Sequence, residues 1–143
     1  MKQYSDEEVL EALEMSATEI AVVNPKLCNQ LTIQVEVEQR DEGPTPHVHV
    51  YHDKTRNPKK CSYVRLDDAS YCSFHGDAPK LPKELKKEFI QVMQSVYVRP
   101  VTSEKRTGYE MAVNIWVDTY EDDFSKFQLD KDNKPIMPDY SKL

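Results

Sequence analysis

The stretch LTIQVEVE, residues 31–38, decides how the rest of this chain is interpreted. Its apolar side chains occupy the odd positions and alternate strictly with polar ones. A period of two is typical of a β-strand with one buried face and one solvated face. A polar turn at residues 39–44 follows, and the next strand, extending to about His52, begins with the sequence HVHVY at residues 47–51. Strands joined by short polar turns usually pair as neighbours, so we expect an antiparallel meander.

Other segments on either side of this pair extend the pattern. Residues 20–23 are apolar and predict a short strand, residues 61–66 alternate again, and residues 70–74 predict a short edge strand. Upstream, Ser5 is followed by three acidic residues, a helix start whose charges favour the positive end of the helix dipole, and this predicts a helix to about Ser16.

The second half of the chain changes to helical spacing. Pro82 suits a helix start, and apolar residues at positions 85, 89, 92, 93 and 96 predict a helix from Pro82 to about Tyr97. A second helix, starting near Ser103 or Thr107, extends to Tyr120. The predicted fold is therefore α+β: an N-terminal helix, a four- to five-stranded antiparallel meander, and two C-terminal helices packed on one face. We expect one domain over residues 1–123 and an extended, partly ordered tail over 124–143.

Composition limits the classes of function. A chain of 143 residues with 38% hydrophobic residues can bury a modest core, and its net charge of -6 disfavours nonspecific binding to a phosphate backbone. Three cysteines and an acidic start without a secretory pattern predict a reduced, cytoplasmic protein. No apolar run is long enough to span a membrane. The final tripeptide Ser141-Lys142-Leu143 matches a peroxisomal address, which three residues also match by chance.

The histidine strand carries the candidate chemistry. His47 and His49 lie two residues apart and should share one face of the sheet, while His52 falls on the other face. The predicted binding set is His47, His49, Tyr51 and His52. A zinc ion would satisfy a tetrahedral site formed by His47, His49, Cys72 and His75. Two other interpretations stay open: local hydrogen bonding on a half-solvated face, and a catalytic or anion-binding role.

Three enzyme classes that share a His-x-His string each lack a required feature. The histidine-triad hydrolases need a third histidine where Tyr51 stands. Cupins need spaced glycines that this chain does not have. Amidohydrolases need a barrel of about 250 residues. The basic segment 54–60 is interpreted as a solvated loop or, alternatively, as a phosphate contact, and the aromatic stripe of Tyr109, Trp116 and Tyr120 as core.

The sequence PHVHVY at residues 46–51, the strand at 61–66, His75-Gly76 and the helix start at Leu81-Pro82 together resemble a small prokaryotic family of unknown function. Members of that family carry a Pro-His-Phe/Val-His-Val strand and are often encoded on mobile elements or beside toxin–antitoxin genes. The resemblance covers residues 20–97 and implies no established catalytic residues. The insert at 53–60 and the added C-terminal helix and tail depart from the family pattern and put a shared partner in doubt.

Together these features favour a small acidic cytoplasmic binding module of phage or mobile-element origin rather than an enzyme. It would act as an antitoxin-like or inhibitor protein by docking a macromolecule, with a protein that has a basic surface as the expected partner. Nucleic acid and membrane are not expected partners, and no cofactor other than zinc is suggested. The alternative is a metal-dependent hydrolase or nuclease that uses His47, His49, His52 or His75, assisted by Asp53 or Asp77.

Overall fold

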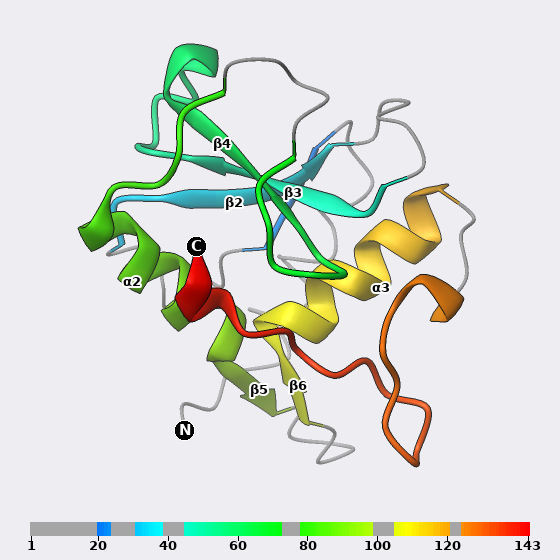
Figure 1. Ribbon diagram of the computed structural model, residues 1–143. Helices are drawn as coiled ribbons and strands as arrows, with labels where there is room; N and C mark the ends of the chain where they lie inside the picture. The colour runs from blue at the N-terminus through cyan, green and yellow to red at the C-terminus, as the bar shows by residue number, and fades with distance from the viewer. Residues whose placement is uncertain (1–19, 24–30, 39–44, 73–77, 99–104, 121–123) are drawn as a thin grey trace.

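The computed structural model describes residues 20–23, 31–38, 45–72, 78–98, 105–120 and 124–143. The helix predicted from Ser5 to Ser16 lies outside these residues. The antiparallel sheet has neighbours in chain order (Figure 1): β1 (Ile20–Val22), β2 (Gln34–Glu38), β3 (His47–Tyr51) and β4 (Cys61–Arg65). The α+β class, with an antiparallel sheet and two helices, is confirmed. Of the strand predicted at 70–74, the structure describes residues 70–72, and there Tyr71 forms a bridge with Val64.

The register of the sheet separates its side chains into an apolar face and a polar face. Val50 lies opposite Val35, and Val48 lies opposite Val64. These valines are fully buried and belong to the same apolar cluster as Phe89 and other side chains of the two helices. The period-two pattern therefore identified the core face of β2 and β3 correctly.

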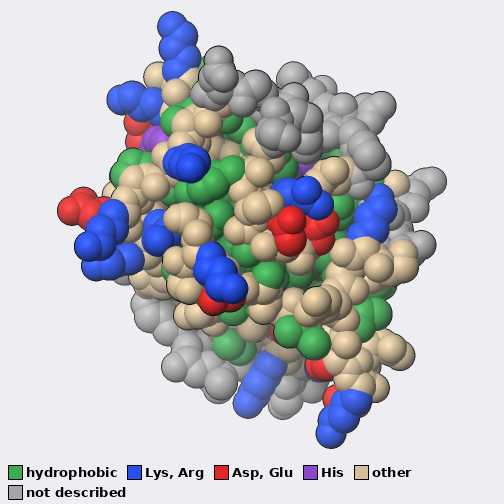
Figure 2. Space-filling view, viewed as in Figure 1, with side chains coloured by type: hydrophobic (Ala, Val, Ile, Leu, Met, Phe, Trp, Pro, Cys, Tyr) green, Lys and Arg blue, Asp and Glu red, His purple; other side chains and the backbone are tan. Residues whose placement is uncertain are grey.

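The helix α2 (Lys83–Gln94) packs Phe89, Val92 and Met93 into this core, and its outer face carries lysines that are visible in Figure 2. It ends three residues earlier than its apolar spacing predicted. The Ser95 hydroxyl donates to the carbonyl of Gln91, and the chain then enters a short strand. That strand, β5 (Val96–Val98), forms a hairpin with β6 (Lys105–Thr107), so the prediction of helix to Tyr97 is wrong at its end.

The second helix, α3 (Gly108–Tyr120), starts where the Thr107 alternative placed it. Its start is a capping box: the Glu110 amide donates to the Thr107 hydroxyl at 3.0 Å, and the Glu110 carboxylate reaches back to the Thr107 amide. Gly108 is required for packing, because a Cβ there would lie 2.0 Å from the backbone oxygen of Val92 in α2. Tyr109 and Trp116 are buried, which confirms their assignment to the core.

The C-terminal segment returns across the molecule and ends beside α2 (Figure 1). Two 3₁₀ turns, Phe124–Lys126 and Tyr140–Lys142, begin and end it. Phe127 is buried, and the Tyr140 ring packs edge-on against Phe89 with 5.1 Å between the ring centroids. The domain boundary at residue 123 stays a prediction, but the segment beyond it contributes two buried aromatic side chains to the core. None of the described helices is long and apolar enough to cross a bilayer.

Candidate functional site

The candidate site is the polar face of the sheet, where the register places Glu36, His49 and Tyr63 in one row across three strands. His47 and His49 share this face as predicted, and their rings stack with centroids 5.3 Å apart. The expectation that the two histidines are half-solvated is wrong, although Tyr63 and Arg65 on the same face are partly exposed. The exposed fractions of Glu36, His47 and His49 are 0%, 1% and 4%. Both histidines therefore lie inside the folded domain.

Contacts around the histidines are aromatic and local. The Nδ1 of His47 lies 2.8 Å from the carbonyl oxygen of Thr45, and a carbonyl can only accept, so this nitrogen carries the proton. The His47 ring lies 5.4 Å from the ring of Trp116 in α3. The His49 ring meets Tyr63 edge-on at 4.7 Å. Of the interpretations left open by the sequence, local hydrogen bonding describes His47, although in a buried setting.

The buried Glu36 carboxylate is neutralised by Arg56 from the loop after β3. Two guanidinium nitrogens donate to its two oxygens at 2.9 and 3.0 Å, and the same guanidinium lies 5.3 Å from the ring centroid of Tyr51. Arg56 reaches this position from a left-handed backbone conformation, with φ at 56°. Burial disfavours its charge, but the hydrogen bond to Glu36 and the charge of Glu36 outweigh burial, so the pKa of Arg56 is raised.

Lys54 of the same loop donates to the carbonyl oxygen of Ile33 at 2.7 Å. Two cations of the basic segment 54–60 therefore contact the sheet, although Lys54 is exposed and Arg56 is partly exposed. The sequence offered no direct signal for this, because a basic loop has the same pattern whether its cations are solvated or hydrogen-bonded to the sheet. Lys59 and Lys60 of the segment are exposed.

His52 belongs to a different site from the other predicted binding residues. Its Nε2 lies 2.8 Å from the hydroxyl of Ser62, which in turn donates to the carbonyl of Pro79 at 2.7 Å. Since the hydroxyl proton is used on Pro79, Nε2 of His52 is the donor. Ser62 lies opposite Val50, on the apolar face, so the predicted set of four is divided between the two faces. Burial lowers the pKa of His52, Lys60 lowers it further, and Asp53 opposes them.

The predicted zinc ligands are only partly described. Cys72 is buried, and its amide donates to the carbonyl of Tyr63, the residue opposite His49. Cys72 is therefore two strand spacings, or about 10 Å, from His49. Among the described residues, no group of three His, Cys, Asp or Glu side chains could hold a metal ion. His75 and Asp77 lie outside those residues, so the four-residue zinc set stays a prediction.

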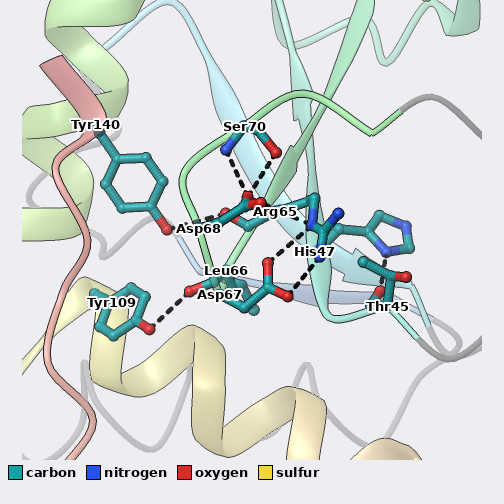
Figure 3. A network of polar contacts seen from close by, with 9 residues as sticks. All are labelled: Thr45, His47, Arg65, Leu66, Asp67, Asp68, Ser70, Tyr109 and Tyr140. Carbon is teal, nitrogen blue, oxygen red and sulfur yellow. Dashed lines mark hydrogen bonds and ion pairs between the residues drawn. The ribbon is translucent and has the colours of Figure 1, made fainter. Parts of the chain in front are cut away.

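A second polar network surrounds Arg65 at the end of β4 (Figure 3). Asp67 accepts two hydrogen bonds from Arg65, at 2.9 and 2.7 Å, and Asp68 lies 3.4 Å from it. Asp68 also accepts from the amide and hydroxyl of Ser70. Burial opposes the charge of Asp68, but these bonds and Arg65 outweigh burial, and the pKa of Asp68 is lowered.

Two tyrosines attach distant segments to this turn. The Tyr109 hydroxyl donates to the carbonyl of Leu66 at 2.7 Å, and the Tyr140 hydroxyl reaches the carbonyl of Arg65 at 3.4 Å (Figure 3). Burial raises the pKa of both hydroxyls well above the ordinary value, so both remain protonated donors. Nothing in the sequence indicated that Tyr140 would reach the chain at Arg65.

A comparison of the chain with protein-family models, curated proteins and solved structures finds no match. The resemblance to a prokaryotic family with a Pro-His-Phe/Val-His-Val strand therefore remains an expectation. Inferences about function have to be made from the geometry.

Proposed function

We propose that this protein is a small binding module that docks a macromolecular partner, in an antitoxin-like or inhibitor role. The observation that carries the proposal is that the buried polar groups of the sheet are engaged in contacts within the domain. Glu36 is neutralised by Arg56, His47 donates to Thr45, and both histidine rings pack against aromatic side chains. These groups make the sheet a rigid support, and a rigid support with charged surroundings is suited to recognition.

The partner we propose is a protein. The net charge of -6 favours association with a basic surface, since complementary charges raise association rates. Partners that carry the same sign of charge are repelled. The same charge disfavours nucleic acid, whose backbone would be repelled by the acid-rich stretches of this chain. The proposed mobile-element or phage origin and the cytoplasmic location rest on the sequence resemblance and on cysteine usage alone.

Native purification of tag-free protein from its host at low ionic strength, followed by crosslinking and mass measurement, tests this proposal. The expected result is a stoichiometric complex with one protein, and co-expression should suppress the activity of that protein. A chain that remains alone in the host at native abundance, and that turns over a substrate, would refute the proposed binding function.

The second candidate is a metal-dependent hydrolase or nuclease. One observation favours it: His47 and His49 project from the same face with stacked rings 5.3 Å apart, so a movement that uncovers them would present two imidazoles together. Metal analysis of protein purified without chelators tests it. About one zinc or iron per chain, lost in a His47→Ala/His49→Ala variant that still folds, would support this candidate. A metal-free folded protein would remove it.

A further inference from the structure

A cluster of lysines on the outer side of α2 has no role in the contacts described above. We name it the lysine face, and it consists of Lys80, Lys83, Lys86, Lys87 and Lys142. Figure 2 shows Lys and Arg side chains at several places on this face of the molecule, with Asp and Glu side chains beside some of them. The cluster contrasts with the net charge of -6. It is therefore a local concentration of charge opposite in sign to the protein as a whole.

Charges on α2 are divided between its two flanks. At 100° per residue, Lys83, Lys86 and Lys87 fall on one side of the helix, and Glu84 and Glu88 fall on the other. The Glu88 carboxylate is already hydrogen-bonded, because it accepts from the backbone amides of Thr32 and Ile33 beside β2. On the lysine flank, Lys83 and Lys87 are exposed and Lys86 is half-buried, whereas the Glu88 carboxylate is turned toward the sheet.

The tertiary structure adds to the cluster from a distant part of the sequence. Tyr140 packs on Phe89, and the Lys86 ammonium donates to the carbonyl of Ser141 at 3.3 Å, which brings Lys142 beside the helix. Lys80 lies with its ammonium 5.9 Å from the ring centroid of Tyr71. Within the described ranges, no ion pair joins any of the five lysines to a carboxylate.

Such a cluster is unfavourable for the isolated protein. Lys83 and Lys87 are one helical turn apart, and like charges at that spacing destabilise a helix. Two acids offset this repulsion in part: Glu84 lies three residues before Lys87, and the pKa of Asp139 is lowered by its hydrogen bonds from Ser141 and by the charge of Lys142. A negative surface on a partner would relieve this repulsion on binding.

We propose that the lysine face docks an acidic segment of the protein partner, separate from the basic surface that the net charge favours, an inference that rests on the binding function proposed above. Carboxylates grouped in a compact patch fit this face better than the phosphates of an extended strand. A compact acidic patch can be contacted by this face alone, since charges beyond about 8 Å are screened at physiological salt, whereas a nucleic acid strand would extend past it toward the acidic remainder of the chain.

A labelled oligoglutamate peptide tests the proposal by fluorescence anisotropy. Wild-type protein should bind it at low salt, and binding should weaken as salt is raised. The Lys83→Gln/Lys87→Gln variant should bind about 2- to 30-fold more weakly, the fold-change for two exposed ion pairs of about 0.2–1 kcal/mol each. The matched control is Lys131→Gln/Lys134→Gln, which removes the same charge from the exposed C-terminal turn and should bind as wild type does.

The variants also separate a docking role from a structural one. Lys83→Gln/Lys87→Gln should unfold at the same or a higher temperature than wild type, while Lys83→Arg/Lys87→Arg should retain binding. Equal losses in the test and control variants, absence of oligoglutamate binding, or tighter binding of an oligonucleotide of equal charge would overturn the proposal. A captured partner that binds Lys83→Gln/Lys87→Gln as tightly as wild type would refute the lysine face and leave the proposed binding function standing.

Discussion

The buried ion pair between Glu36 and Arg56 gives the sharpest test of how this domain is stabilised. The Glu36 side chain is fully buried, whereas the Arg56 side chain is 38% exposed. Replacing Arg56 with alanine would leave a buried carboxylate without its cation. Removing one partner of a buried pair costs about 3–5 kcal/mol. Because water can enter where the half-exposed guanidinium was, we expect the lower value of about 2–3 kcal/mol for Arg56→Ala.

Urea unfolding followed by fluorescence of the single tryptophan, the buried Trp116, measures this loss as a change in the free energy of unfolding. The Arg56→Ala/Glu36→Gln double variant removes both charges while keeping the shape of the buried side chain. It should be more stable than Arg56→Ala alone by at least about 0.5 kcal/mol, since neighbouring partners couple. Arg56→Met keeps most of the apolar stem over Tyr51 and separates packing from charge.

Lys59→Ala serves as the control, because Lys59 is exposed on the same loop and should change stability by less than about 0.5 kcal/mol. If Arg56→Ala is as stable as this control, the pair does not hold the loop on the sheet. If Glu36→Gln gives no recovery in the Arg56→Ala background, the loss comes from packing and the electrostatic argument is wrong.

Three further predictions concern the helix contact, the C-terminal segment and pH. Gly108→Ala places a Cβ 2.0 Å from the backbone oxygen of Val92, so thermal unfolding should show a loss of about 3 kcal/mol or more; an unchanged melting temperature would contradict the close approach. Tyr140→Ala should lose about 3–5 kcal/mol of aromatic packing against Phe89, and Tyr140→Phe about 1 kcal/mol or less; equal losses would mean that the hydroxyl dominates. The pKa of His52 is lowered from 6.5, so the folded protein binds fewer protons than the unfolded chain near that pH. Its contribution to stability is therefore present above about pH 6.5 and lost as the pH falls below it, and His52→Gln should flatten the stability curve between about pH 5 and 7. If the stability of the His52→Gln variant changes with pH as steeply as that of wild type, His52 does not cause this pH dependence.

The candidate site shows which inferences from local pattern succeed. Alternation along β3 correctly placed His47 and His49 on one face and His52 on the other, because side-chain direction in a strand depends only on the pleat. The helical spacing of Phe89, Val92 and Met93 likewise identified the buried side of α2. These properties belong to one element at a time, and a single sequence contains them.

The errors concern features that need two elements. Glu36 was assigned to a solvated face because its neighbours alternate in polarity, yet it is buried and its charge is balanced by Arg56, 20 residues later. Val96 continued the helical spacing of α2, but hydrogen bonds to β6 place it in a strand. In both cases a tertiary partner overrode a local preference.

The sequence by itself determined the α+β class, the core faces of β2, β3 and α2, and the shared side of the histidine pair, since periodicity follows from backbone geometry. Only the tertiary structure decided that Glu36 and the two histidines of the polar face are buried, that the loop after β3 supplies a cation to Glu36, and that Tyr140 and Lys142 lie beside α2. These depend on which segments, far apart in sequence, come into contact. Burial and ion pairing are properties of such contacts, and no pattern within one segment encodes them.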